Sequence, residues 1–362
     1  MKTLGGFCVC AALALWACSP GGAGPRSTTQ VPAVKSATSA QIVAINSAQP
    51  TAPEAQAPAA GLSQTQAQTP SPDIIKAEVL LARAHASPGV IDGLAGSNLK
   101  RAVAAFEAMN GLPQDGQLSS AVWAKLDTAG PPAAAYYAET AQDVAGPFYP
   151  FVGENFVAAS KLASPGYSSP LEMLAARFHM SQALLKMLNP GADFQRAGQA
   201  LVVVNPRIPA LPDVKTIQVD KAKASVRAYD AGGVMVGSFP ATVGSTERPS
   251  PSGVRKVKGV SFNPTYTYDP AKLTWGPKSH GRFTIRPGPN NPVGLVWIAL
   301  NAPGYGIHGS PNPDKIGKTA SHGCVRLTNW DALLLAHAVH FGDVVTFINE
   351  RAGASDAHAP NI

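Results

Sequence analysis

The chain has 362 residues, which is long enough for two or three domains. Charged residues make up only 14% of it, whereas 34 glycines and 33 prolines are present. The net charge of +7 is modest for this length and suits an anionic cell envelope as a partner. Lysines and arginines form no cluster with interleaved aromatic residues, which excludes the signature of a nucleic-acid-binding protein.

The first 18 residues are predicted to be a signal peptide for export. A lysine near the start precedes an apolar run over 7–17, and Ser-Pro-Gly-Gly follows. The run is shorter than the ~20 residues that a membrane-spanning helix needs and has the layout of a secretory signal; a buried N-terminal helix is the alternative. Leu-Trp-Ala-Cys at 15–18 resembles the lipobox of bacterial lipoproteins, which implies lipidation of Cys18 and a membrane anchor.

Residues 19–72 are predicted to be a disordered linker, because Ala, Pro, Gln, Ser and Thr dominate and leave little to form a core. In the next segment, 73–128, apolar residues at helical spacing alternate with Gly and Asp-Gly turns, which predicts three short helices. The pattern SPGVIDGLAGSNLKRAVAAFEAMNGLPQDGQLSSAVWAKL resembles the small helical peptidoglycan-binding domain. Glu107 stands where that family usually has glutamine. A structural three-helix spacer is the alternative.

Residues 129–165 are predicted to form a second linker, which leads to a third module at 166–207. Apolar residues recur there at helical intervals, Asn-Pro-Gly at 189–191 ends the second helix, and a strand is expected at 200–204. The order SSPLEMLAARFHMSQALLKMLNPGADFQRAGQALVVVNP resembles a LysM module, a small α+β fold that binds glycans containing N-acetylglucosamine. Its first strand is poorly marked in the sequence.

Residues 213–351 predict a mainly-β domain, a sandwich or barrel with one main helix. Alternating or branched-rich runs lie at 214–219, 224–229, 234–242, 295–300 and 343–349, with Gly and Pro clusters between several of them. The helix is expected from Trp330 to about His340, with Thr328 as its cap and Asp331 three positions later. A flexible tail is expected at 352–362. The fold class is therefore multidomain, with the mainly-β domain preceded by the three-helix domain and the α+β module.

Cys324 lies in the polar, glycine-containing loop TASHGCVRLTNWD. A buried filler would need apolar neighbours, and a structural zinc site usually takes four ligands with paired cysteines, whereas only His308 and His322 accompany this thiol. A nucleophile needs a base and oxyanion donors. Either histidine could be that base, the Gly309 carbonyl could set the tautomer of His308, and the N–H groups of Gly323 and Cys324 could stabilise an oxyanion. The loop therefore favours an acyl-transfer site.

The stretch GIHGSPNPDKIGKTASHGCVRLTNWDA resembles the signature of the L,D-transpeptidase (YkuD-type) catalytic domain, and PSPSGVRKV and GPNNPVGLVWIAL upstream agree with it. The resemblance implies that Cys324 is the nucleophile, that His308 is the proton donor and acceptor, and that Gly309 orients His308. It implies a supporting role for His322 and an oxyanion role for Gly323.

Substrate contacts are predicted from three further residues. Arg326 is expected to anchor a substrate carboxylate, with a structural salt bridge as the alternative. Ser321 is a candidate substrate contact, and Tyr305 could line the groove or belong to the core.

The resemblance implies an exported enzyme that attacks the L,D bond after the third residue of a tetrapeptide stem in peptidoglycan. The reaction needs no cofactor and no metal: a thioester forms on Cys324, and an amine or water resolves it. An L,D-carboxypeptidase with the same thiol and a non-catalytic wall-binding scaffold are the alternatives. Stem peptides and glycan strands are the expected partners, and the periplasm or cell envelope is the expected location. The sequence leaves open the oligomeric state and the acceptor, which is a stem peptide, a protein or a D-amino acid.

Overall fold

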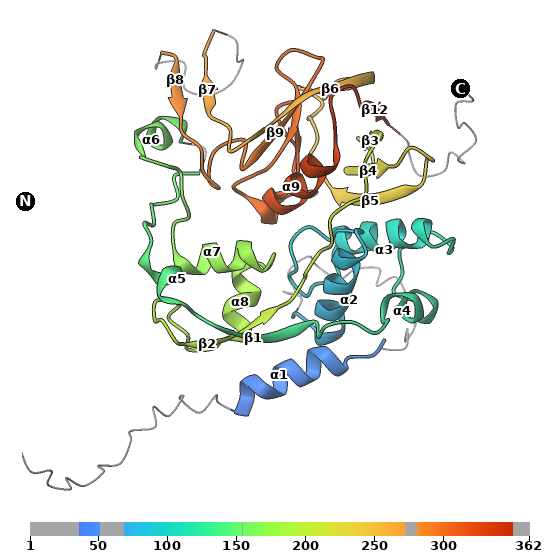
Figure 1. Ribbon diagram of the computed structural model, residues 1–362, viewed down its shortest axis with the longest axis vertical. Coiled ribbons are helices and arrows are strands. Elements are labelled where there is room, and N and C mark those ends of the chain that lie inside the picture. The colour runs from blue at the N-terminus through green and yellow to red at the C-terminus, as the bar shows by residue number, and fades with distance from the viewer. Residues whose placement is uncertain (1–35, 51–68, 154, 272–280, 350–362) are drawn as a thin grey trace, which may run out of the picture. The chain divides into compact units, whose positions relative to one another are not determined.

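The computed structural model describes residues 36–50, 69–153, 155–271 and 281–349 (Figure 1). The predicted signal peptide, Cys18 and the predicted tail at 352–362 lie outside these ranges. Among the described residues, no helix has both the length and the apolar character needed to cross a membrane.

The C-terminal part of the chain is built on a mixed sheet, which confirms the mainly-β fold class. Its strands in spatial order are β11 (Val325–Arg326), β10 (Gly306–His308), β9 (Val296–Leu300), β6 (Gly253–Phe262), β12 (Val344–Ile348), β3 (Thr216–Asp220), β4 (Ser225–Tyr229) and β5 (Met235–Pro240). The pairs β10–β11 and β12–β3 are parallel, and the other neighbours are antiparallel. Strands β7 (Tyr266–Tyr268) and β8 (Phe283–Ile285) form a separate antiparallel pair.

Helix α9 (Asn329–Ala338) packs against β9 and β10 and covers the part of the sheet that ends at the predicted site (Figure 1). Thr328 is its N-cap, since its hydroxyl accepts a hydrogen bond from the Asp331 amide at 3.1 Å. A short 3₁₀ helix, η1 (Pro313–Lys315), lies between β10 and β11. The core of this domain gathers alternate residues of the strands with one face of α9, including Ile217, Val226, Ile298, Leu335 and Val345.

Each of the five predicted strand runs overlaps an observed strand, whereas β6 is among the strands that were not predicted. Its sequence, GVRKVKGVSF, is rich in basic residues, and only Val257 among its side chains is buried. Backbone pairing with β9 on one side and β12 on the other fixes this strand in the middle of the sheet. Its position is therefore set by tertiary pairing, which overrides a weak local β preference.

Three helices form the helical module, as predicted: α2 (Pro72–Arg83), α3 (Ser97–Met109) and α4 (Ser120–Leu126). The apolar residues expected to form its core, such as Leu99, Val103 and Phe106, are buried. Glu107 is also buried, and its carboxylate accepts a hydrogen bond from the Gly116 amide at 2.8 Å. The residue that departs from the family pattern therefore holds the turn that follows α3.

The prediction of a linker at 129–165 was wrong in part, because ordered elements form there: β1 (Ala134–Ala138), α5 (Ala141–Ala145) and α6 (Phe156–Lys161). Strand β1 pairs antiparallel with β2 (Ala200–Val204), and α7 (Pro170–Arg177) and α8 (Gln182–Leu188) lie between them in sequence (Figure 1). Strand β1 lies before the predicted bounds of the third module, 166–207. Its residues gain their order from β2, since a single strand has no local partner. The LysM resemblance itself stays a prediction.

The prediction of disorder throughout 19–72 was also wrong, because helix α1 (Ser36–Ser47) forms inside that segment. Ile45 is 1% exposed, and the Asn46 side chain exchanges hydrogen bonds with the backbone of Ala134, at 2.9 and 3.0 Å. The average composition of the segment concealed a short apolar pattern, QIVAI. Ile45 shares one hydrophobic core with Ile75 of α2 and with the third module, so these parts are not independently packed units.

Candidate active site

His308 ends the short strand β10, where it lies between two neighbouring strands. In the register of the sheet it is opposite Trp297 of β9 and opposite Arg326 of β11. Its ring is buried and stacks on Trp297 with the ring centroids 5.4 Å apart. Nδ1 lies 2.7 Å from the carbonyl oxygen of Gly309. Because a carbonyl oxygen only accepts, Nδ1 carries the hydrogen, and Nε2 is left as the acceptor that a general base needs.

Gly309 can hold His308 in this way because its backbone is packed tightly against helix α9. A Cβ at Gly309 would overlap the side-chain oxygen of Asn329, which accepts a hydrogen bond from the Leu295 amide at 3.0 Å. The Asn329 amide group donates to the Pro289 carbonyl at 3.0 Å. The predicted orienting role of Gly309 thus has a physical basis, and Asn329 is a supporting residue that the sequence did not reveal.

Cys324 is half-buried in the loop that leads into β11, directly before the residues that pair with β10. Its thiol donates to the carbonyl of Gly304 across 3.5 Å. Ser321 closes the loop, since its hydroxyl donates to the Cys324 carbonyl at 2.5 Å and accepts from the Gly323 amide at 3.2 Å. Gly323 has a φ of +117°, and a Cβ there would lie 3.1 Å from the Tyr305 ring, so glycine is required.

These contacts change the roles predicted for two residues. Ser321 is 3% exposed and uses its hydroxyl within the loop, so it shapes the loop around Cys324 and is not a surface that a substrate can reach. The Gly323 amide is already engaged with that hydroxyl, so the Cys324 amide is the better oxyanion donor of the two predicted groups. Tyr305 is half-buried beside Gly323, and His322 is exposed.

The electrostatics of the pair favour a neutral resting state. Burial lowers the pKa of His308 to about 3, with the nearby charge of Arg326 as the second cause, while the hydrogen bond to Gly309 opposes the shift. Burial raises the pKa of the Cys324 thiol, against smaller opposing effects from the backbone of Gly306 and from Arg326. At neutral pH the imidazole is therefore uncharged and can accept a proton, and the thiol is protonated.

Arg326 is half-buried beside this pair. Its Nε is buried without a hydrogen-bond partner among the described residues, and the ion pairs found within them do not include it. The structural salt bridge considered as the alternative role for Arg326 is therefore not formed within this part of the chain. A buried, unpaired guanidinium nitrogen is suited to a carboxylate that arrives with a ligand.

A cavity of about 300 Å³ lies next to the stacked pair of Trp297 and His308 and is lined by Trp297, Tyr266 and Val293, among others. Burial raises the pKa of Tyr266, with smaller raising effects from Cys324 and Tyr268 and an opposing effect from Arg326, so Tyr266 is electrostatically coupled to the site. The sequence did not single out Tyr266, because it lies in a short alternating run without a motif.

The described residues contain no cluster of three or more His, Cys, Asp or Glu side chains that could hold a metal ion.

The sequence profile of the YkuD family, described as "L,D-transpeptidase catalytic domain", matches residues 214–347. A second profile, "Putative peptidoglycan binding domain", matches residues 70–126. The "Putative L,D-transpeptidase YkuD" of Bacillus subtilis (strain 168) is 33% identical over 180 residues, which cover 49% of this chain and 92% of that protein. The chain belongs to the L,D-transpeptidase family.

Other similarities cover different shares of this chain and of the proteins compared with it. The "Probable L,D-transpeptidase YbiS" of Escherichia coli (strain K12) is 31% identical to this L,D-transpeptidase family member over 196 residues, 52% of this chain and 63% of that relative. Among solved structures, L,D-transpeptidase 3 from Mycobacterium tuberculosis has 18% identity and a TM-score of 0.32, and covers 42% of this chain and 76% of its own. The catalytic domain of an E. faecium L,D-transpeptidase has 20% identity and a TM-score of 0.30; the match covers 38% of this chain and 98% of that domain.

Proposed function

We propose that this chain is an L,D-transpeptidase that acts on peptidoglycan stem peptides through a thioester at Cys324. One observation carries the proposal: the parallel pairing of β10 and β11 sets His308 opposite Arg326, two residues after Cys324. A buried, neutral imidazole with Nδ1 fixed by Gly309 and a guanidinium with an unpaired nitrogen thus lie opposite each other on paired strands, and the thiol of Cys324 is two residues before that guanidinium.

The first half of the cycle transfers an acyl group to sulfur. Nε2 of His308 takes the thiol proton as Sγ of Cys324 attacks the carbonyl of the third stem residue. The carbon–nitrogen bond to the terminal D-alanine breaks, and the imidazolium returns the proton to the leaving amine. The Cys324 amide stabilises the oxyanion of the tetrahedral intermediate, and Arg326 binds a carboxylate of the donor.

The second half releases the acyl group. An acceptor amine attacks the thioester, His308 takes its proton, the carbon–sulfur bond breaks, and the proton returns to the thiolate. A water molecule in place of the amine would make the same site an L,D-carboxypeptidase. Incubation of the enzyme with a tetrapeptide donor and an excess of acceptor amine separates the two, because only the transpeptidase forms a new amide product.

The decisive experiment is intact-mass spectrometry of the full chain after incubation with a carbapenem, a class expected to acylate the cysteine of this family. We expect one adduct on the wild type and none on Cys324→Ala, with release of the adduct by hydroxylamine, which cleaves thioesters. No adduct on the wild type, or an adduct that persists on Cys324→Ala, would contradict the proposed nucleophile. In the first case a wall-binding scaffold becomes the better explanation.

The auxiliary parts are proposed to serve the same substrate. The match of residues 70–126 to a peptidoglycan-binding family supports an affinity for the cell wall, and the LysM-like module is proposed to contact glycan strands. Export through residues 1–18, with lipid attachment at Cys18, would place the enzyme in the periplasm or envelope. The mass of the N-terminal peptide of the mature protein, isolated from bacterial envelopes, tests both steps.

A further inference from the structure

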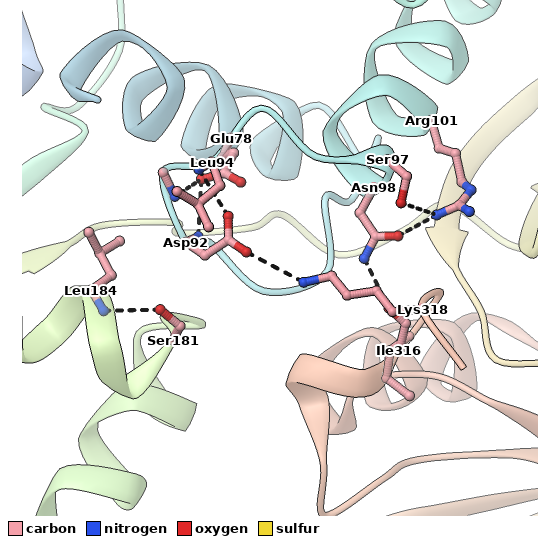
Figure 2. Close-up of polar contacts among 11 residues, drawn as sticks. Glu78, Asp92, Leu94, Ser97, Asn98, Arg101, Ser181, Leu184, Ile316 and Lys318 are labelled. Carbon is pink, nitrogen blue, oxygen red and sulfur yellow. Dashed lines mark hydrogen bonds and ion pairs between the residues drawn. The ribbon is translucent and has the colours of Figure 1, made fainter. Parts of the chain in front are cut away.

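The segment between His308 and Cys324 touches the helical module. Asn98, in the first turn of α3, donates from Nδ2 to the Ile316 carbonyl at 2.9 Å, and this hydrogen bond is buried (Figure 2). Nη1 of Arg101 donates to Oδ1 of Asn98 at 2.5 Å, which fixes the orientation of the Asn98 amide. A Cβ at Gly317 would overlap Oδ1 of Asn98, so the two surfaces are in close contact.

The part of the helical module that makes this contact is itself held rigidly. Glu78 of α2 is 2% exposed, and its carboxylate accepts hydrogen bonds from the amides of Asp92 and Gly93 at 3.2 and 2.8 Å (Figure 2). The Asp92 carboxylate in turn lies 3.5 Å from Nζ of Lys318. The turn before α3 is therefore a fixed platform. Asn98 follows this turn and contacts Ile316, and Asp92 within the turn pairs with Lys318.

On its other side the same segment is bound to Thr242, which pairs with Arg326, two residues after Cys324. The hydroxyl of Thr242 accepts from the Gly317 amide at 3.1 Å and donates to the Lys315 carbonyl at 3.2 Å. Thr242 and Arg326 exchange two backbone hydrogen bonds of 2.9 Å, and the Ser321 amide donates to the Val243 carbonyl at 2.7 Å. A displacement at Ile316 would therefore be passed to the loop of Cys324 through Thr242.

The helical module is also fixed to the strand that leads to Thr242. Strand β5 is the outer strand of the sheet, and Ala86 forms a parallel bridge with its Ser238. The Ser87 amide donates to the Ser238 carbonyl at 2.8 Å, and the Ser238 amide donates to the His85 carbonyl at 2.8 Å. The module thus pairs with the outer edge of β5, whose backbone N–H and C=O groups would otherwise have no strand partner.

We propose that Asn98 is a positioning residue for Cys324, so that the helical module braces the active-site loop in addition to any affinity for the cell wall. The proposal rests on the nucleophilic role of Cys324 given above. The brace consists of the hydrogen bond from Asn98 to Ile316 on one side and the contacts of Thr242 on the other. Its effect is to hold the loop in the conformation from which sulfur attacks.

The test compares Asn98→Asp with Asn110→Ala in the full chain. Aspartate keeps the shape of the side chain and the acceptor for Arg101, but it cannot donate to the Ile316 carbonyl. Asn110 is the matched control, because its Nδ2 also donates one hydrogen bond to a backbone carbonyl, that of Phe106 at 2.8 Å, entirely within the helical module. The melting temperature of each variant measures the structural cost that both substitutions share.

Two measurements are made on each protein. Carbapenem acylation, followed by intact mass over a range of concentrations, gives a maximal rate and a half-saturating concentration. We expect Asn98→Asp to lower the maximal rate roughly tenfold, the factor that one hydrogen bond of ordinary strength carries, with the half-saturating concentration unchanged. Hydrogen exchange is expected to accelerate at the amides of Gly317 and Ser321. Asn110→Ala should change neither the maximal rate nor the hydrogen exchange of these two amides.

Equal maximal rates for wild type and Asn98→Asp would overturn the positioning role, as would an equal loss in Asn110→Ala. Failure of the proposed function has a different signature: the wild type itself then forms no adduct. In that case hydrogen exchange decides, since unchanged protection of Gly317 and Ser321 in Asn98→Asp shows that no brace exists.

Discussion

Asp331, in the first turn of α9, links this helix to the helical module, and its replacement by asparagine tests the energetics of that link. The side chain is 1% exposed. Its Oδ2 accepts a hydrogen bond from the Ser87 hydroxyl at 3.0 Å, whereas Oδ1 is buried without a partner among the described residues. Burial raises the pKa of Asp331 to about 7, against smaller opposing effects from Thr328 and Ser87.

A raised pKa means that the folded protein binds this proton more tightly than the unfolded chain does. The resulting stabilisation is complete below about pH 4, the ordinary value of an aspartate, and is lost as the pH rises through about 7. At ~1.4 kcal/mol per unit of pKa, the change between pH 5 and pH 8 is about 2.5 kcal/mol.

Two histidines act in the opposite direction, so the wild type alone does not reveal this effect. Burial lowers the pKa of His308 to about 3 and that of His179 to about 4. Their contributions to stability are present above about pH 6.5 and are lost as the pH falls toward those values. The quantity to measure is therefore the difference in unfolding free energy between wild type and Asp331→Asn, which cancels the histidines.

Urea unfolding at pH 5 and pH 8 gives this difference. We expect Asp331→Asn to gain about 2.5 kcal/mol relative to the wild type on going from pH 5 to pH 8, because asparagine carries no charge at either pH. Asp193→Asn serves as the control, since Asp193 lies at the surface in an exposed pair with Arg196. A difference that is the same at both pH values within about 0.5 kcal/mol would refute the assignment of a buried, protonated Asp331.

Three further predictions concern the active site. The lowered pKa of His308 predicts that the rate of carbapenem acylation stays constant between pH 7 and pH 5, whereas a fall in this rate with a midpoint near pH 6.5 would indicate an ordinary imidazole. His308→Gln should lower the rate by about 10²–10⁴. Arg326→Gln should lower kcat/KM for a tetrapeptide donor roughly 10–100-fold through loss of a charge-assisted hydrogen bond, but leave hydroxylamine-sensitive acylation detectable. Gly309→Ala should destabilise the fold by about 1–3 kcal/mol in urea and slow acylation, because its Cβ overlaps Asn329.

The sequence alone could suggest the candidate active-site loop, because the residues that indicate its chemistry lie close together in the chain. His308, Gly309, Gly323 and Cys324 lie within one short stretch, and their residue types alone pointed to a base, an oriented tautomer and a nucleophile. The sequence could not reveal how Ser321 uses its hydroxyl, since the same side chain can face a substrate or close a turn. Only the contacts with the Cys324 carbonyl and the Gly323 amide settle that choice.

The missed elements depend on partners far away in sequence. Strand β6 has few buried side chains and is ordered by pairing with β9 and β12, and β1 is ordered by β2, more than sixty residues away, where Ala134 pairs with Val204. Helix α1 is anchored by Ile45 and by the hydrogen bonds of Asn46 to that same Ala134. Patterns read over a short window do not contain these partners, so β6 was not predicted as a strand and the segments of β1 and α1 were assigned to linkers.

Helix α2 gives the physical reason why the modules cannot be treated one at a time. Ile75 and Val79 belong to the core that includes the third module, whereas Leu81 belongs to the core formed with α3 and α4. A helix with buried residues on several sides needs partners on each of them. Removal of the third module would therefore expose apolar surface on α2, and α2 carries Glu78, which shapes the platform beneath Asn98. Truncation would thus disturb the brace of the active site, and single substitutions in the full chain are the sound way to separate wall binding from positioning.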